Sequence, residues 1–481
     1  MADLDKTKEK QYLIGRSAET VELRRIGDLP ESSILVIYGR RRVGKTSLIE
    51  SVFAKRNLIK IEGAEGVKPD RQLELATQQL KISLNLNNLT LSAFSNWLEF
   101  FHFLAKETEK GIWTLYFEEL QWLAGESSSF VAEFKIAWDN YFRKNPKLLV
   151  VLCGSSPTFM VSQVLRSKAL YNRSQHELHL QEFALSETKE FMGARYSDEQ
   201  VLDAHLLVGG IPEYLKYLKE DRSVFISLCK NSFKSNGYFV NEYERVFAST
   251  LAKNQTYRGV IEILSVYGAQ TRASLLQRLK LRSGGGISAI LEELVLCGFV
   301  DRYAPYNLQQ DGKSVRYAIG DNYLHFYNKF IRPNLTEIGS RRFDVEPTSA
   351  INKSDLDLFM SHRFEQFCRK NHWVIAKILG FSAVKYRSGA FFQRKSLDAD
   401  DGFQWDLVFD RADKVLTLCE IKYTSSPVGR SVIEDFETRI EKTRIPVQKS
   451  IQRVLISVKG ASRELTEEPY FDRIVTLKDF F

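Results

Sequence analysis

The residues from Gly39 to Thr46 carry the clearest chemical signal in this chain of 481 residues. They read G-x-x-x-x-G-K-T and stand between an apolar run, Ile34–Tyr38, and a segment with helical spacing. The two glycines let backbone N–H groups and a helix N-terminus face a phosphate chain. Lys45 can reach the β- and γ-phosphates, and the Thr46 hydroxyl can ligate Mg²⁺. The pattern predicts ATP binding with Mg²⁺ through Gly39, Arg40, Arg41, Arg42, Val43, Gly44, Lys45, Thr46 and Ser47.

Two carboxylates follow another apolar run. Trp113–Phe117 reads as a buried strand, and Glu118 and Glu119 come directly after it. In enzymes with such a loop, one acid at this place holds Mg²⁺ and its neighbour polarises the attacking water. We therefore predict that Glu118 binds the metal and that Glu119 is catalytic. The usual first acid is Asp, so the additional methylene of Glu118 affects metal affinity or turnover; the alternative is a strand that merely ends in surface acids.

A third apolar run, Leu148–Leu152, ends in Cys153-Gly154-Ser155-Ser156. Ligands of open α/β sheets bind at the carboxyl ends of the strands. Ser155 and Ser156 are therefore candidates for sensing the γ-phosphate, although ordinary turn chemistry explains small polar residues almost as well.

Composition sets the broad class of the protein. A net charge of +8 permits contact with nucleic acid or anionic lipid without requiring it. The five cysteines lack the spacing of a zinc site or a disulfide framework, which favours reduced thiols in a cytoplasmic protein. The polar stretch Met1–Lys10 does not read as a signal peptide. No run approaches the roughly 20 apolar residues of a membrane span, so we expect no membrane contact.

Taken together, five motifs resemble those of the archaeal-type ATPases, an AAA-related family in the STAND group of P-loop NTPases. The motifs are Ile14-Gly15-Arg16, Tyr38–Thr46, Glu118-Glu119, Cys153–Ser156 and Gly209–Tyr214. The resemblance covers roughly residues 10–330 and implies an ATPase core over 10–185 and a helical lid over 186–255.

The resemblance also assigns roles to single residues. Gly15 and Arg16 would flank the adenine base, although on physical grounds alone they only start a capped amphipathic helix. Arg173 looks like the family's arginine after the sensor strand and would act on the γ-phosphate, in cis or in trans. The sequence departs from the family at Glu118, where Asp is usual, and at Asn172, where Gly is usual.

Residues 256–330 have the pattern of a winged helix, with three helical segments followed by two short strands. The segment expected to be the recognition helix, Ile287–Cys297, contains two glutamates and no Lys or Arg. DNA readout needs basic residues there, so a protein-contact role is favoured over base recognition. Residues 331–354, with two prolines and few apolar residues, read as a linker.

The last segment, residues 355–481, has a second set of chemical residues. Asp406 begins one predicted strand, and period two places Glu420 and Lys422 on one face of the next. This D-x13-E-x-K pattern resembles the PD-(D/E)XK nucleases, and Glu365 on a preceding helix stands where that fold often completes its metal site. The resemblance implies a metal centre of Glu365, Asp406 and Glu420, with Lys422 assisting phosphodiester hydrolysis.

The expected protein is of the α/β class: a P-loop NTPase core with helical lid, a winged helix and a C-terminal restriction-endonuclease-like domain. We predict an ATPase with ATP and Mg²⁺ as cofactors, whose nucleotide cycle controls the nuclease-like domain. Expected partners are DNA at that domain and a protein or a second copy of the chain. The alternative is a slow nucleotide switch that acts as a scaffold and whose inactive tail binds a partner.

Overall fold

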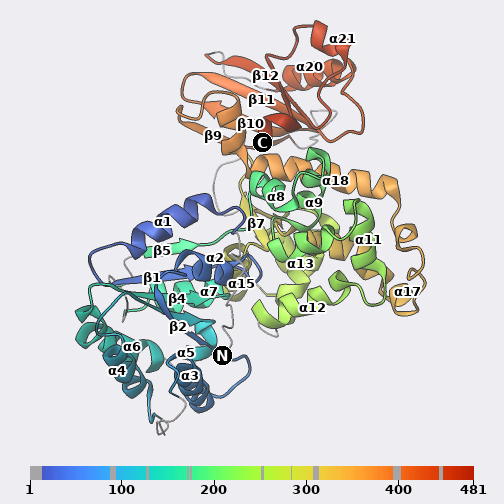
Figure 1. The fold of residues 1–481 in the computed structure, drawn as a ribbon. Helices are drawn as coiled ribbons and strands as arrows, with labels where there is room; N and C mark the ends of the chain where they lie inside the picture. The colour runs from blue at the N-terminus through green and yellow to red at the C-terminus, as the bar shows by residue number, and fades with distance from the viewer. Residues whose placement is uncertain are drawn as a thin grey trace. The chain divides into compact units, whose positions relative to one another are not determined.

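The computed structural model describes residues 13–86, 94–125, 129–168, 170, 173, 176–250, 254–282, 284–306, 314–393, 402–443 and 448–481. The chain divides into two compact units (Figure 1). The first ends at Phe183 and includes Ile211–Glu213; the second comprises Ala184–Gly210 and Tyr214–Phe481. Asn172 lies outside the described residues. Within those ranges, no helix is both long and apolar enough to span a bilayer.

The first unit is built on a parallel five-stranded sheet in the order β2-β3-β4-β1-β5. The strands are β1 Ser33–Tyr38, β2 Asn57–Glu62, β3 Trp113–Glu118, β4 Leu148–Gly154 and β5 His176–His179. The helices are α1 Ser17–Gly27, α2 Lys45–Val52, α3 Pro69–Ser83, α4 Trp97–Glu107, α5 Leu120–Ala124, α6 Ser129–Asn140 and α7 Pro157–Phe159. The α/β class with a parallel sheet is confirmed.

Both faces of this sheet are covered, which is why its central strands β1, β3 and β4 are largely apolar. On one face Val36, Phe117 and Val150 pack against α3, α4 and α6. On the other face Ile37 and Val151 pack against α1 and α2. Because all five strands run in the same direction, their carboxyl ends lie at one edge of the sheet, where the loop Gly39–Gly44 begins.

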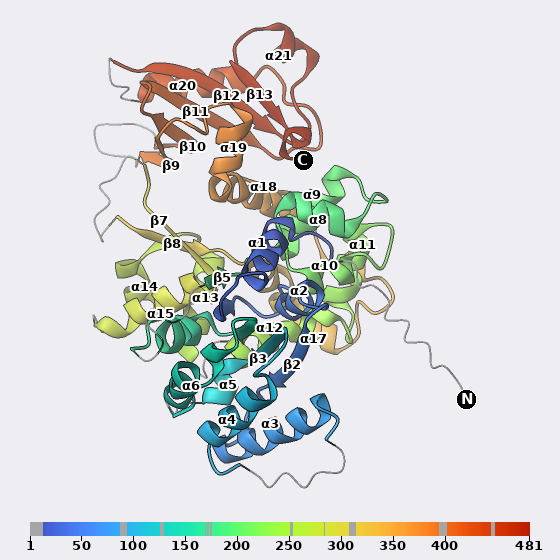
Figure 2. The ribbon, with the colours of Figure 1, turned by 60° about the vertical axis from the view of Figure 1, so that its left-hand side comes forward.

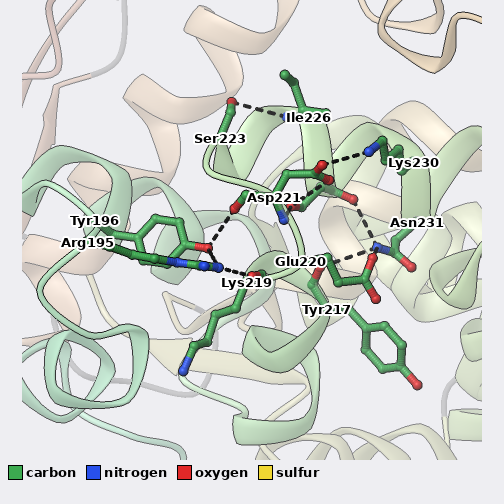
Figure 3. Close-up of polar contacts among 11 residues, drawn as sticks. Arg195, Tyr196, Tyr217, Lys219, Glu220, Asp221, Ser223, Ile226, Lys230 and Asn231 are labelled. Atoms are coloured by element: carbon green, nitrogen blue, oxygen red, sulfur yellow. Dashed lines mark hydrogen bonds and ion pairs between the residues drawn. The ribbon is translucent and has the colours of Figure 1, made fainter.

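The second unit starts with helices in the segment predicted as a lid. They are α8 Leu185–Met192, α9 Asp198–Val208, α10 Pro212–Leu218, α11 Val224–Phe233 and α12 Tyr238–Thr250. Polar contacts fix the connection between α10 and α11 (Figure 3). The Asp221 carboxylate accepts from Lys230 at 2.7 Å, and the Asp221 carbonyl accepts from the Tyr196 hydroxyl at 2.7 Å. The Tyr214 hydroxyl donates to Glu242 at 2.7 Å between two buried side chains.

Three helices and a small antiparallel sheet follow. The helices are α13 Gln255–Tyr267, α14 Arg272–Arg278 and α15 Gly285–Leu296, and the sheet order is β6-β8-β7 with β6 Gln270–Thr271, β7 Val300–Tyr303 and β8 Arg316–Ile319. The segment predicted as a linker contains α17 Leu335–Gly339, after α16 Asn322–Phe326. Its Ile338 and Phe343 are buried, so this segment packs against the unit.

The C-terminal segment forms a mixed sheet in the order β13-β12-β11-β10-β9, drawn in orange and red in Figure 2. β10 is antiparallel to β9 and to β11, whereas β11, β12 and β13 run parallel to one another. The strands are β9 Tyr386–Gln393, β10 Phe403–Arg411, β11 Val415–Lys422, β12 Ser450–Ser457 and β13 Arg473–Thr476. The helices are α18 Lys353–Lys370, α19 His372–Ile378, α20 Val432–Lys442 and α21 Arg463–Glu467.

Helix α9 packs against this C-terminal part. It lies beside α18, and the Tyr423 hydroxyl, one residue after β11, donates to Asp203 at 2.6 Å. Lys459 pairs with Glu199 at 2.5 Å. Burial raises the pKa of Asp203 to about 6; the charges of Glu199 and Asp357 add to this, whereas the Tyr423 hydroxyl and Lys459 oppose it.

This raised pKa predicts a pH-dependent stability. An acid whose pKa is higher in the folded than in the unfolded chain binds more protons when folded, so its contribution to stability falls as pH rises from about 4 to about 6. The shift from 3.8 to about 6 corresponds to about 3 kcal/mol at about 1.4 kcal/mol per pKa unit. Asp203→Asn removes the effect, so its Tm relative to wild type should increase by a few degrees between pH 4 and pH 7.

Differential scanning calorimetry across this pH range checks the prediction. The matched control is Asp198→Asn on the same helix, where the carboxylate pairs with Lys189 at 2.7 Å and no such increase is expected. A constant Tm difference between Asp203→Asn and wild type would contradict the assigned pKa.

Candidate nucleotide site and the C-terminal acidic cluster

The loop Gly39–Gly44 depends on its two glycines for different reasons. A side chain at Gly39 would meet the Leu180 carbonyl oxygen at 2.3 Å, because β5 approaches the loop there. Gly44 has φ +92° immediately before α2, in the left-handed region that glycine adopts without strain. The loop therefore curves tightly and leads into the N-terminus of α2, as an anion-binding loop requires.

Lys45 is almost fully buried, and its ammonium lies against the inner side of the loop. Its Nζ donates to the carbonyl oxygens of Gly39 and Arg40, each at 2.9 Å. Burial lowers the pKa of Lys45, while the nearby Glu118 and Glu119 partly oppose that change. A phosphate chain in the loop would replace weak carbonyl partners with full negative charges.

Glu118 is the last residue of β3 and is also buried. Its Oε1 accepts from the Thr46 hydroxyl, and its Oε2 pairs with Lys60 Nζ at 2.6 Å. Thr46 and Glu118 are thus in contact and offer the hard oxygen ligands that Mg²⁺ prefers. The predicted pair of metal ligands is brought together from α2 and β3.

Glu119 leaves the strand and takes a left-handed conformation with φ 51° at the start of α5. Its Oε2 accepts from the Ser155 hydroxyl at 2.5 Å, from the Ser155 N–H at 3.2 Å and from Gln121 Nε2 at 2.6 Å. Arg41 lies 3.9 Å from Oε1 of the same carboxylate. These contacts hold the carboxylate in one orientation beside the loop.

The structure separates the two sensor candidates. Ser155 is buried and contacts Glu119, whereas Ser156 caps α7 by accepting from the Phe159 N–H at 3.4 Å. Ser156 therefore has a local structural role.

The Arg16 side chain contacts the backbone of the nucleotide loop. Its Nη2 donates to the carbonyl oxygens of Val43, at 3.0 Å, and of Gln181, at 2.6 Å. Its guanidinium also lies 4.6 Å from the centre of the Phe183 ring. Arg16 thus links the loop to the end of the first unit; contact of Gly15 and Arg16 with an adenine base stays a prediction.

Arg173 lies toward the amino ends of the strands, whereas the loop Gly39–Gly44 lies at their carboxyl ends. It donates to the Asp139 carboxylate through Nε at 2.9 Å and Nη2 at 3.1 Å. Asp139 is in the last turn of α6, before β4 begins, and Arg173 precedes β5, whose His176 lies beside Leu35 of the parallel β1. Arg173 thus approaches the amino ends of the strands, whereas Lys45 follows the carboxyl end of β1.

In the second unit, the C-terminal acidic cluster contains Glu365, Asp406, Glu420 and Lys422. Lys422 Nζ lies 2.8 Å from Glu420 Oε1, so the predicted shared face is confirmed. Asp406 accepts from the Ile421 N–H at 3.2 Å, where β10 shifts register against β9. Burial raises the pKa of Asp406 to about 7, and the charges of Glu365 and Glu420 add to this effect.

Cationic side chains of the protein pair with two acids of this cluster. Glu420 has a second cationic partner, since Arg439 of α20 donates to its Oε2 at 2.6 Å. Glu365 lies 3.5 Å from Arg369. Among the described residues, no group of three or more His, Cys, Asp or Glu side chains is placed to hold a metal ion. Lys422 and Arg439 thus pair with Glu420, and Arg369 lies near Glu365; metal binding by Glu365, Asp406 and Glu420 stays a prediction.

Comparison with known proteins identifies the first unit. Residues 13–218 match the model of an ATPase domain found predominantly in Archaea. This ATPase domain comprises the described residues of the first unit and the helices α8 to α10. The chain is therefore an ATPase.

Similar whole chains are distant. An uncharacterized protein of Methanocaldococcus jannaschii is 25% identical over 358 residues, which are 74% of this chain and 76% of that protein. A Walker-type ATPase of Pyrococcus abyssi is similar with a TM-score of 0.49 and 16% identity, over 66% of this chain and 96% of that one. The ORC2 protein of Aeropyrum pernix, in ADPNP–ADP complexes, gives a TM-score of 0.39 and 12% identity, over 69% and 95%.

Three residues at these sites have no place in the sequence motifs. Lys60 interrupts the apolar strand Leu58–Ile61, and that interruption is a signal in the sequence. Gln121 follows Glu119 by two residues at the start of α5, so its contact is local, although no motif indicates it. Arg439 carries no such signal, because it reaches Glu420 from α20, and only the fold brings the two together.

The contacts of Lys45 give a direct prediction for the ATPase domain. Lys45→Ala removes the ammonium that lies against the loop and should weaken ATP binding at least tenfold, since a charge-assisted contact is worth about 1.5–3 kcal/mol. Isothermal calorimetry with a non-hydrolysable ATP analogue measures this. Lys55→Ala, at an exposed position after α2, is the matched control and should bind like wild type. Unchanged affinity in Lys45→Ala would contradict the site.

Proposed function

We propose that the chain is a Mg²⁺-dependent ATPase of the AAA-related type, whose nucleotide cycle acts on its C-terminal part. The observation that carries this proposal is the pair of held carboxylates beside the loop. Glu118 contacts Thr46, and Glu119 is fixed by Ser155 and Gln121. These contacts support a role in metal binding for Glu118 and a role in water activation for Glu119.

Thr46 and Glu118 would hold Mg²⁺, which neutralises charge that develops on the transferred phosphoryl group. Lys45 would bind the β- and γ-phosphates. Glu119 would accept the proton of the attacking water, and its fixed orientation supports that role because general bases need defined geometry. Ser155, as its hydrogen-bond donor, would report the presence of the γ-phosphate to the same carboxylate.

Arg173 would act in trans, from a second copy of the chain. Leu35, beside the start of β5, precedes Gly39 by four residues, or about 13 Å along an extended strand. The loop and Arg173 lie toward opposite edges of one sheet, which supports action on a neighbour's nucleotide over action on its own. An arginine supplied in trans stabilises transition-state charge in related phosphoryl transfers. A homo-oligomer follows from this proposal.

Complementation between two variants tests both roles. Glu119→Gln should retain ATP but lose hydrolysis at least 100-fold, because general-base catalysis contributes about 10²–10⁴. Arg173→Ala should also lose turnover. A mixture of the two should recover part of the activity, since sites with an intact Glu119 then receive Arg173 from the other variant. Phosphate release at constant total protein measures the recovery.

The control mixture pairs Glu119→Gln with Lys45→Ala. Both residues would act in the site of their own chain, so every site in this mixture lacks one of them. This mixture should therefore recover no activity. Normal hydrolysis by Glu119→Gln would contradict the role of this acid. If the mixture of Glu119→Gln and Arg173→Ala is only as active as the two variants measured separately and summed, action in trans is contradicted.

Coupling between the nucleotide state of the ATPase domain and the C-terminal part would pass through α9. This helix ends immediately before Gly209–Tyr214, the motif that the resemblance assigns to the lid, and it contacts the residue after Lys422 through Asp203. A shift of α9 with nucleotide state would therefore be transmitted to the end of β11.

The segment α13–β8 would be a winged helix used for protein contact. Its three helices and the sheet β6-β8-β7 support the fold. Helix α15 lacks basic residues, and Arg272 is engaged by Ser288 at 2.9 Å and by the Gly284 carbonyl at 2.7 Å. Arg278 stacks on Tyr267 at 3.7 Å. These contacts leave the segment poorly suited to base readout.

For the C-terminal domain, the geometry supports the alternative function, a restriction-endonuclease-like fold that binds a partner without cutting. The α18–β9–β10–β11–α20–β12 order supports the fold. Glu420 is buried and paired with both Lys422 and Arg439, so it functions as the centre of an internal ion cluster. Breaking such a buried pair is costly, which supports a structural role.

A cleavage assay tests this interpretation. Wild-type protein should not cut single- or double-stranded DNA or RNA with Mg²⁺ or Mn²⁺, with or without ATP, because its candidate ligands are already neutralised. Lys422→Ala should behave identically and keep normal ATP turnover, since the proposed nucleotide site lies in the other unit. Metal-dependent cleavage by wild type that disappears in Lys422→Ala would instead establish a nuclease.

A further inference from the structure

Lys60 is a charged residue in an otherwise apolar part of β2. Its neighbours Ile59 and Ile61 are buried against α3 and α4 on one face of the sheet. Period two therefore turns Lys60 to the other face, toward α2. Register places Lys60 beside Tyr116, two residues before Glu118 on the adjacent strand. The fold thus brings a second lysine to the nucleotide site, from outside the loop.

Lys60 has three carboxylates within 4 Å. Its Nζ lies 2.6 Å from Glu118 Oε2, 3.2 Å from Glu50 Oε1 and 3.8 Å from Glu62 Oε2. The other oxygen of Glu118 is bonded to Thr46. Both oxygens of Glu118 are therefore engaged by groups of the protein: Oε1 by the Thr46 hydroxyl and Oε2 by the Lys60 ammonium.

We propose that Lys60 competes with the divalent cation for Glu118 and thereby sets the metal affinity of the ATPase domain. This inference rests on the proposed role of Thr46 and Glu118 as metal ligands. An ammonium in contact with a carboxylate neutralises it, and a positive charge this close repels a second cation. Metal binding at Glu118 thus requires Lys60 to withdraw.

Glu50 and Glu62 make that withdrawal possible. Glu50 comes from α2 and Glu62 ends β2, and both are already within 4 Å of the ammonium. When Lys60 leaves Glu118, these acids retain it, so no charge is left without a partner. The length of Glu118 is consistent with this exchange, because the additional methylene relative to Asp lets one carboxylate reach both Thr46 and Lys60.

Metal affinity of the full-length chain, saturated with a non-hydrolysable ATP analogue, tests the proposal. Electron paramagnetic resonance measures the concentration of free Mn²⁺ directly. Lys60→Gln should bind Mn²⁺ on the order of tenfold more tightly than wild type, because the competing charge is gone. Lys60→Arg, which keeps the charge, should stay near wild type. Glu50→Gln should bind Mn²⁺ more weakly, since Lys60 loses its nearest alternative partner.

The opposite signs distinguish competition from a merely structural role, which would weaken metal binding in both variants. Lys55→Gln is the matched control and should equal wild type. If Lys60→Gln does not fold, Lys60→Met, which also removes the charge, carries the same test and should bind Mn²⁺ more tightly. If wild type binds metal but Lys60→Gln does not bind it more tightly, or Glu50→Gln does not bind it more weakly, the inference is overturned. If wild type with nucleotide binds no metal, the proposed function falls as well.

Discussion

The parallel register of β1, β2, β3 and β4 is the constraint on which the nucleotide site depends. It places the carboxyl ends of four strands at one edge of the sheet. The same register pairs Glu62 with Glu118 and sets Lys60 on the α2 side. A slip of one residue would turn Glu118 away from Thr46, because side chains alternate between the two faces. Burial of both faces by apolar side chains makes such a slip costly.

Charge balance within the protein is the second theme. Lys45 donates hydrogen bonds to carbonyl oxygens, and Glu118 forms an ion pair with Lys60. Glu119 accepts hydrogen bonds from Ser155 and Gln121. Glu420 forms ion pairs with Lys422 and Arg439. Buried charges are expensive unless they are paired. At the nucleotide site the partners are weak or exchangeable, which suits the proposed binding of phosphates and a cation. At Glu420 the partners are two full charges in close contact, which suits a fixed cluster.

The sequence predicted the nucleotide site because its chemistry is local. Gly39, Gly44, Lys45 and Thr46 lie within eight residues, and Glu118 and Glu119 stand at the end of a recognisable strand. The partners of these residues could not be predicted in the same way. Lys60 and Ser155 reach the acids across neighbouring strands, so their roles depend on strand order. In the C-terminal sheet, period two correctly paired Glu420 with Lys422, but the approach of Arg439 from α20 depends on tertiary packing.

Release of phosphate from ATP by the purified wild-type chain tests the central claim most directly. Turnover is measured with excess Mg²⁺ and again after the divalent cations are removed by a chelator. If Thr46 and Glu118 position a metal and Glu119 activates water, hydrolysis occurs with Mg²⁺ and stops without it. Hydrolysis that continues at the same rate after chelation would contradict the proposed site, as would tight ATP binding with no hydrolysis in the presence of Mg²⁺.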